Sequence, residues 1–102
     1  MKLSLPYEQI AQFCRKWNVS EFALFGSVLR DDFRADSDVD VLVTFRPESR
    51  VSLFDFPGMQ DELEAIFGRR VDLLTRRGVE ESRNPYRKKS ILDSAEVVYA
   101  AA

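Results

Sequence analysis

Two aspartates separated by one residue, Asp38 and Asp40, stand at the start of an apolar run that ends at Phe45. In an extended strand, side chains two positions apart lie on the same face with Cα atoms about 6.5 Å apart, so both carboxylates can reach one cation or bridge two. Two acids beside an apolar strand repel each other, which makes a metal or another cation the expected neighbour. An Asp-x-Asp pair alone is a weak signal, because aspartates are also common in turns.

A glycine and a serine, Gly26 and Ser27, follow another short apolar run, Phe22–Phe25. Glycine allows a phosphate to approach the backbone closely, and a helix that begins here would direct its free N–H groups at an anion. The Ser27 hydroxyl adds a donor. Taken alone, this pair is equally typical of an ordinary strand-to-helix turn in which serine caps the helix.

A third acid, Asp72, lies within the short apolar run Val71–Thr75. If this run forms a strand beside the one that carries Asp40, Asp72 can lie next to the aspartate pair. The alternative is a structural role as the partner of an arginine such as Arg30. Three carboxylates and a phosphate-binding turn together suit phosphoryl or nucleotidyl transfer, in which metal ions neutralise the triphosphate.

Residues that the sequence lacks exclude other kinds of site. There is no histidine, which removes a Ser-His-Asp triad and histidine-bound zinc. The single cysteine, Cys14, cannot form an internal disulfide, and its place on an apolar helical stripe favours a buried side chain over a reactive thiol. The net charge of −2, from 15 basic and 17 acidic residues, makes direct nucleic-acid binding unlikely to be the main activity. What remains is carboxylate chemistry with an oxygen-binding cation such as magnesium.

Hydrophobic periodicity predicts the elements that would position these residues. Four helical segments are predicted: residues 6–17, 27–32, 53–67 and 85–99. Three strands are predicted: residues 22–25, 39–45 and 71–75. A polar connection is predicted over 34–37, and residues 76–78 are predicted to close the third strand. Along residues 39–45, alternation predicts that Leu42 shares the face of the aspartates and that the opposite side faces the core: Val39, Val41, Val43 and Phe45.

The chain of 102 residues shows no repeat, linker or composition shift, so residues 1–102 are expected to form a single domain. No window approaches the roughly 18 apolar residues of a membrane span, and the N-terminus lacks the pattern of a signal peptide. These features predict a cytoplasmic protein with no membrane association.

Gly26 and Ser27, followed after ten residues by Asp38 and Asp40, resemble the Gly-Ser-x10-Asp-x-Asp signature of the DNA polymerase β-like nucleotidyltransferases. The longer string GSVLRDDFRADSDVDVLV resembles the minimal nucleotidyltransferases, the MntA-like antitoxins that are paired with HEPN toxins. The resemblance extends over nearly the whole chain. It departs at Asp31, where many relatives have glycine, but this position supplies no ligand.

The resemblance implies an α+β fold: a small mixed sheet of three or more strands with flanking helices, forming a polymerase β-like nucleotidyltransferase core. It also implies that Gly26 and Ser27 contact the triphosphate of ATP and that Asp38 and Asp40 hold Mg²⁺. Asp72 would complete the metal site and assist the acceptor hydroxyl.

The resemblance further implies a partner, because family members of this size transfer AMP from ATP to a tyrosine of a HEPN ribonuclease toxin and thereby silence it. A hetero-oligomer with such a toxin is therefore expected. Arg30 matches a recurrent arginine that orients the loop or the phosphates, and a structural salt bridge is the open alternative. Two other functions stay open: an antitoxin that acts by binding alone, and nucleotidyl transfer to a tRNA end or a small molecule.

Other residues have open explanations. The basic side chains at the front of the last predicted helix could dock an acidic or RNA-bearing partner or could simply be solvated: Arg83, Arg87, Lys88 and Lys89. Phe54 and Phe56 could pack in the core or form a surface for a partner. Four arginines flank the Asp72 run, and the sequence singles out none of them for phosphate binding: Arg69, Arg70, Arg76 and Arg77.

Overall fold

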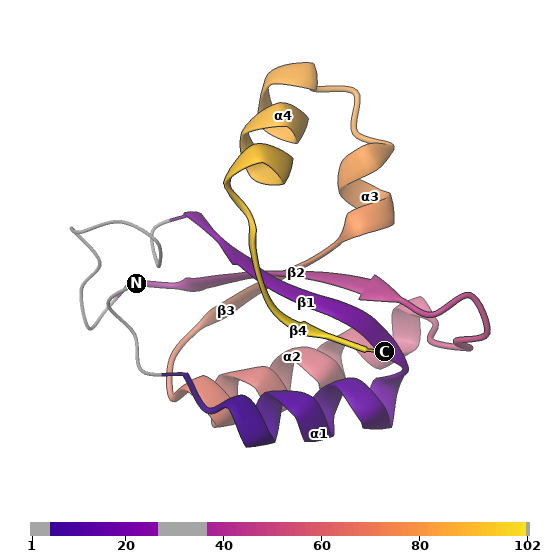
Figure 1. The fold of residues 1–102 in the computed structure, drawn as a ribbon, viewed down its shortest axis with the longest axis vertical. Helices are drawn as coiled ribbons and strands as arrows, with labels where there is room; N and C mark the ends of the chain where they lie inside the picture. The colour runs from indigo at the N-terminus through magenta and orange to yellow at the C-terminus, as the bar shows by residue number, and fades with distance from the viewer. Residues whose placement is uncertain (1–4, 27–36, 102) are drawn as a thin grey trace.

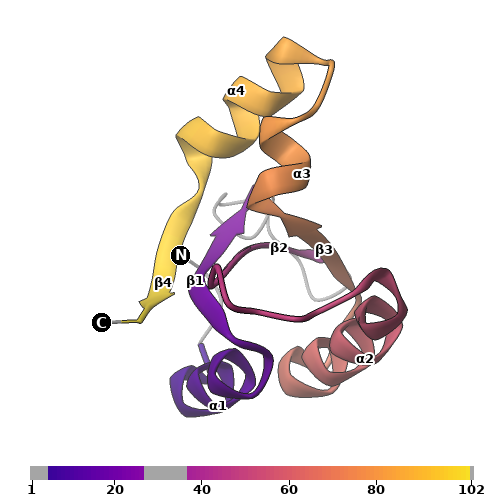
Figure 2. The same cartoon turned by 90° about the vertical axis from the view of Figure 1, so that its right-hand side faces the viewer.

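The computed structural model describes residues 5–26 and 37–101, and within them the chain forms a four-stranded sheet with helices on both faces (Figures 1 and 2). The elements, in chain order, are α1 (Tyr7–Trp17), β1 (Val19–Phe25), β2 (Val39–Phe45), η2 (Leu53–Asp55), α2 (Phe56–Phe67), β3 (Val71–Thr75), α3 (Arg76–Glu80), α4 (Pro85–Ser94) and β4 (Glu96–Ala100). The strand order is β3-β2-β1-β4. β2 runs parallel to β3 and antiparallel to β1, and β4 runs antiparallel to β1. The predicted α+β fold with a small mixed sheet is confirmed.

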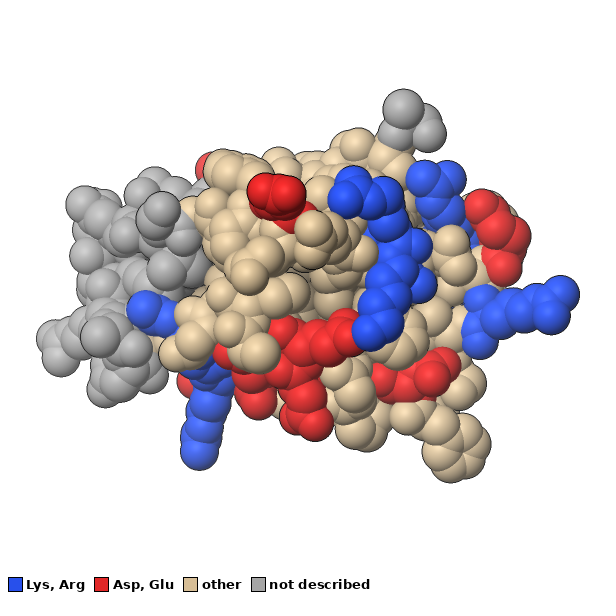
Figure 3. Space-filling model, turned by 90° about the horizontal axis from the view of Figure 1, so that it is seen from below, with Lys and Arg blue, Asp and Glu red and all other residues tan. Residues whose placement is uncertain are grey.

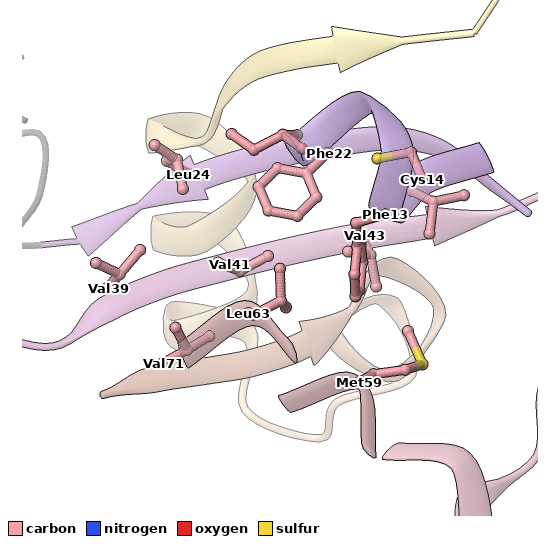
Figure 4. Packing of buried hydrophobic residues seen from close by; sticks show 12 residues of the cluster. Phe13, Cys14, Phe22, Leu24, Val39, Val41, Val43, Met59, Leu63 and Val71 are labelled. Atoms are coloured by element: carbon pink, nitrogen blue, oxygen red, sulfur yellow. The ribbon is translucent and has the colours of Figure 1, made fainter. Parts of the chain in front are cut away.

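The main core lies between the sheet and the two helices α1 and α2, which cover one of its faces (Figure 2). Alternate residues of β2 enter this core, as predicted, because side chains of a strand point to alternate faces: Val39, Val41 and Val43. Phe22 of β1 is fully buried near the centre, with its ring 6.1 Å from that of Phe13 and 6.4 Å from that of Phe67. Figure 4 shows the buried residues of this core, among them Phe13, Phe22 and the three valines of β2, between the strands and the helices. The helix faces that build this core carry the buried residues Ile10, Phe13 and Cys14 of α1 and Met59 and Leu63 of α2.

A second, smaller apolar cluster lies on the opposite face, under α3 and α4. Leu42 of β2 belongs to it and is buried, together with Val79 of α3 and Ile91 of α4. Because Asp40 and Leu42 are two positions apart, both side chains point to this face. The sequence indicated that Leu42 shares the face of the aspartates, but not that helices cover that part of it.

The last predicted helix, residues 85–99, is wrong in its second half. α4 ends at Ser94, Ala95 has extended backbone (ψ 132°), and Glu96–Ala100 form β4. β4 pairs with β1, with Phe22 opposite Tyr99 and Ala23 opposite Val97. The residues after Ala95 include valines and a tyrosine, which prefer strands, and the open edge of β1 offers them a full set of hydrogen bonds. The periodicity could not reveal this partner, because β1 lies more than seventy residues earlier.

Two further predictions are settled by local hydrogen bonds. Residues 76–78 do more than close a strand, because α3 begins at Arg76 with the Thr75 hydroxyl accepting from Gly78 N–H at 3.0 Å. The predicted helix 53–67 is divided in the structure into the short η2 and α2, and α2 is followed by Gly68 with φ +69°. The predicted helix 27–32 and most of the connection 34–37 lie outside the described residues.

The two phenylalanines after β2 have different roles. Phe54 is 95% exposed, whereas Phe56 is half-buried and stacks on Phe45 with ring centroids 6.3 Å apart.

No helix within the described ranges has the length and apolar character that a membrane span requires.

Cys14 is 1% exposed and belongs to the core, which confirms its predicted structural role. Burial raises the pKa of its thiol from 9.0 to about 12, against a smaller opposing effect of Arg15. The thiol thus stays protonated in the folded protein at a pH where it ionises in the unfolded chain. Its contribution to stability is complete below pH 9.0 and is lost as the pH rises from there to about 12.

We therefore expect iodoacetamide to leave Cys14 unmodified in the native protein at pH 9 and to alkylate it rapidly in 8 M urea, measured by mass spectrometry. The midpoint of urea unfolding should fall more steeply above pH 9 for the parent than for Cys14→Ala, which lacks the thiol. Equal alkylation rates with and without urea would contradict this burial.

Candidate active site

The structure places Asp40 and Asp72 directly opposite each other on neighbouring strands. β2 and β3 pair in parallel, with Asp40 in register with Asp72 and Leu42 in register with Leu74. Residues in register point to the same face of a sheet, and adjacent strands lie about 4.8 Å apart. Asp40 is half-buried and Asp72 is exposed. The condition under which Asp72 can lie next to the aspartate pair is therefore met, and the pairing brings together two acids that are far apart in sequence.

Asp38 directly precedes β2 and is exposed. The start of β2 is fixed to the start of β3, because Val39 N–H donates to the Arg70 carbonyl at 2.9 Å. Arg69 Nη1 adds a second tie by donating to the Ser37 carbonyl at 3.3 Å, one residue before Asp38. All three acids therefore lie where the two parallel strands begin.

Two of the four arginines that flank the Asp72 run, Arg69 and Arg70, precede β3, and Arg69 has a defined contact there. Its bond to Ser37 places it at the end of β3 that carries the acids, whereas Arg76 and Arg77 begin α3 at the opposite end. The signal that distinguishes these residues is their position before or after the Asp72 strand. Sequence order alone could not assign either end to the site, because the direction of β3 relative to β2 is a tertiary property.

Gly26 ends β1 with φ +74°, a backbone conformation that favours glycine. It follows Phe25, the residue of β1 that pairs with Asp40. A Cβ at Gly26 would lie 3.2 Å from Asp40 Cγ and 3.6 Å from Asp40 Cβ, and it would collide with Asp40 Oδ2. The positive φ favours glycine here, and the missing side chain allows the Asp40 carboxylate to lie directly against the Gly26 backbone.

Two predicted site residues, Ser27 and Arg30, lie outside the described residues. Of the predicted phosphate-binding turn, only Gly26 is thus placed, beside Asp40. The described half of the site comprises Gly26, Asp38, Asp40 and Asp72, and the structure brings them to one end of the sheet.

The donor set fits magnesium. The side chains at this end supply carboxylate oxygens, the ligands that Mg²⁺ prefers. Over residues 5–26 and 37–101, no three acidic or cysteine side chains are close enough to hold a metal ion by themselves. Asp38, Asp40 and Asp72 thus do not form a three-carboxylate group in this structure, and the expectation that Asp72 completes the metal site stays a prediction. In nucleotide enzymes, one or two carboxylates commonly bind Mg²⁺ together with substrate phosphates and water.

A separate charged cluster joins α1 to α2 on the other side of the molecule. Glu62 accepts hydrogen bonds from the Trp17 indole at 2.6 Å and from the Lys16 ammonium. Burial alone would raise the pKa of Glu62, but these two donors outweigh it and hold the pKa below its ordinary value. Figure 3 shows acidic and basic side chains side by side on this helical face. The cluster fastens the two helices together and lies away from the aspartates.

Comparison with known proteins gives matches over most of the chain. The family model described as a nucleotidyltransferase domain matches residues 7–98. A putative protein adenylyltransferase of Methanocaldococcus jannaschii is 38% identical over 76 residues, which is 74% of this chain and 73% of that protein. A solved structure of a putative minimal nucleotidyltransferase is 31% identical and superposes with a TM-score of 0.66 over 88% of this chain and 86% of its own.

A third match concerns the fold alone, because its sequence identity is 16%. The matched chain comes from a solved structure of a tri-AMPylated Shewanella oneidensis HEPN toxin in complex with an MNT antitoxin. Its TM-score is 0.64, and the match covers 93% of this chain and 70% of the matched chain.

Proposed function

This chain belongs to the nucleotidyltransferase domain family, and from that premise we propose that it is a magnesium-dependent enzyme that transfers AMP from ATP to a tyrosine of a partner HEPN toxin. The name of the Methanocaldococcus relative supports a protein as the acceptor. The AMPylated toxin in the Shewanella complex supports a HEPN partner. We propose that residues 1–102 act as one minimal domain in the cytoplasm, where ATP and magnesium are available.

The observation that carries the proposal is the contact between Gly26 and Asp40 at the place where Asp40 faces Asp72. Two carboxylates in register, beside a glycine backbone that a phosphate can approach closely, are suited to a triphosphate that is bound together with a cation.

In the proposed reaction, the tyrosine oxygen attacks the α-phosphorus of ATP. The new oxygen–phosphorus bond forms as the bond from the α-phosphorus to the bridging oxygen breaks, and pyrophosphate leaves with that electron pair. We assign acceptance of the hydroxyl proton to the carboxylate of Asp72, which is exposed and therefore open to an incoming chain.

The other residues bind and orient. Asp38 and Asp40 would hold Mg²⁺, which supplies neutralisation of the phosphate charge and lowers the pKa of the attacking hydroxyl. Gly26 and Ser27 would contact the triphosphate through backbone N–H groups and the serine hydroxyl. Arg30 would orient the phosphates.

We expect that incubation of the purified chain with ATP, Mg²⁺ and its HEPN partner adds adenylyl mass to a tyrosine of the partner, measured by intact mass and peptide sequencing. Omission of Mg²⁺ or replacement of ATP by AMP should abolish the addition, because the reaction needs a pyrophosphate leaving group.

An unchanged partner mass, in a preparation that binds ATP, would refute the assignment of this acceptor. Repeating the reaction with radiolabelled ATP and total tRNA then tests the alternative acceptor directly. Label on the tRNA would keep the chemistry and replace the acceptor.

A further inference from the structure

A groove runs along the outer edge of β3, the strand that carries Asp72. Within the described residues β3 is an edge strand of the sheet, with α3 above it and the start of α2 below (Figure 2). The cavity has a volume of about 310 Å³. Its floor is the second half of β3 from Leu73 to Thr75, and its walls come from α3, α4 and Phe56.

The backbone of β3 presents hydrogen-bonding groups to this groove. Val39 pairs with Val71, but its N–H donates to the carbonyl of the preceding residue, Arg70. The N–H and C=O groups of Val71 therefore point away from β2, and so do those of every second residue after it in β3. Accordingly, Val71 N–H donates to Glu64 Oε2 at 3.1 Å, on α2. The next outward pair is the N–H and C=O of Leu73, which lies in the groove. An extended peptide can pair with such an edge.

The groove walls combine apolar surface with positive charge. Leu73 and Leu74 are only half-buried and line the groove, so they leave apolar surface in it. Arg87 and Lys88 stand at the rim, and none of the described lining residues is acidic. Lys88 Nζ is held in place by the Glu80 carbonyl at 2.9 Å. The surface is complementary to a segment that has an apolar side chain next to a carboxylate.

The groove also leads to the candidate active site. Asp72 is the residue before Leu73, and Asp72 and Leu74 point to the same face because they are two positions apart. A peptide that extends along β3 advances about 3.3 Å per residue. If one of its residues lies opposite Leu74, the residue that lies opposite Asp72 is therefore only one or two positions away in the peptide.

We propose that this groove binds an extended segment of the acceptor protein, which adds as a strand to β3, places a carboxylate at Arg87 and Lys88, and thereby directs the acceptor hydroxyl toward Asp72. The inference rests on the proposed function, since it supplies the way in which that function recognises a protein acceptor. It assigns acceptor recognition to a surface separate from the carboxylates that bind the metal.

The test compares two double charge reversals on the same part of the chain. Arg87→Glu with Lys88→Glu alters the groove rim, whereas Arg83→Glu with Lys89→Glu alters exposed residues that do not line the groove. Both change the net charge equally. Lys89 loses an exposed ion pair with Asp93, a change of little effect on stability. Affinity for the HEPN partner is measured by calorimetry, and KM for the partner and for ATP by transfer kinetics.

We expect the groove variant to raise the Kd and the KM for the partner about tenfold, with KM for ATP unchanged, and the control variant to change neither more than about twofold. Equal losses in both variants would show a general charge effect and overturn the proposal, and so would unchanged affinity in the groove variant. If the unmodified protein binds its partner but transfers no AMP, the proposed function fails. The calorimetric affinities of the two variants for the partner then still test the groove.

A photo-crosslinking residue locates the occupant directly. Benzoylphenylalanine is placed at Ser82, which lines the groove, or at Ser90, an exposed residue of α4 that does not. Crosslinks from Ser82 to one short partner peptide that contains an acidic residue support the proposal. A link between two copies of this chain, or no link from Ser82 in an intact complex, would overturn it.

Discussion

The double substitution Asp38→Asn, Asp40→Asn is expected to lower the rate of AMP transfer by about 10³-fold or more, because loss of a metal site removes several kcal/mol of transition-state stabilisation. Asparagine keeps the shape of both side chains but removes the negative charges that would hold Mg²⁺. Asp38 is exposed and Asp40 is half-buried at the end of the sheet, so the fold and the affinity for the partner should persist. Single-turnover transfer and partner affinity are measured on the same preparation.

The matched control is Asp61→Asn, which neutralises an exposed acid on α2 and should leave the rate unchanged. The same variants also separate the enzyme from an antitoxin that acts by contact alone. If the double variant protects cells from the toxin as well as the parent does, binding explains the protection. Loss of protection with retained affinity would identify chemistry as the cause.

Gly26→Ala is expected to reduce both stability and transfer. The left-handed backbone costs an alanine about 1–2 kcal/mol. The added Cβ also collides with the Asp40 carboxylate, and overpacking of this kind typically costs about 1–3 kcal/mol more. Displacement of a reacting group by about 1 Å can reduce a rate about 10²-fold, so we expect a loss of that order. Urea unfolding and initial transfer rates measure the two effects.

Gly68→Ala provides the control that isolates the contact. Gly68 has φ +69°, close to the φ of +74° at Gly26, but a Cβ there has no neighbouring atom within 4 Å. The two variants therefore share the backbone penalty and differ in the collision with Asp40. Transfer by Gly68→Ala should match that of the parent once the fraction of folded protein is accounted for. Equal losses of activity in the two variants would mean that the close contact between Gly26 and the Asp40 carboxylate does not matter for transfer.

The position of Asp72 shows why the site could be predicted only in part. Its membership of an apolar run was visible in the sequence, and the run became β3 with the predicted bounds. Its partner was not visible, because pairing in register with Asp40 depends on a crossover through α2 that brings β3 beside β2 in parallel. Arg69 reaches Ser37 for the same reason.

At the end of the chain, by contrast, the structure contradicts the element type that the sequence predicted. The pattern from Pro85 onward fits a helix, but only the part up to Ser94 is one. Short apolar runs such as Val97–Tyr99 carry no period that distinguishes helix from strand. The edge of β1 decided the matter by offering backbone partners to Glu96–Ala100.

The α+β class was expected from the family resemblance and was confirmed. By itself, the sequence determined the bounds of β2 and β3 and the alternate residues of β2 that enter the core, and it supplied the candidate residues of the site. These properties are local: they depend on alternation, on helical spacing and on the residue types that a cation or a phosphate requires. Only the tertiary structure decided that Asp40 faces Asp72, that Gly26 touches Asp40, and that the edge of β3 is open along a cationic groove. Strand order, strand direction and exposed edges arise from contacts between distant residues, and no local pattern contains them. The Asp38–Asp40 pair thus suggested carboxylate chemistry, while the sheet determined which distant residues lie beside it.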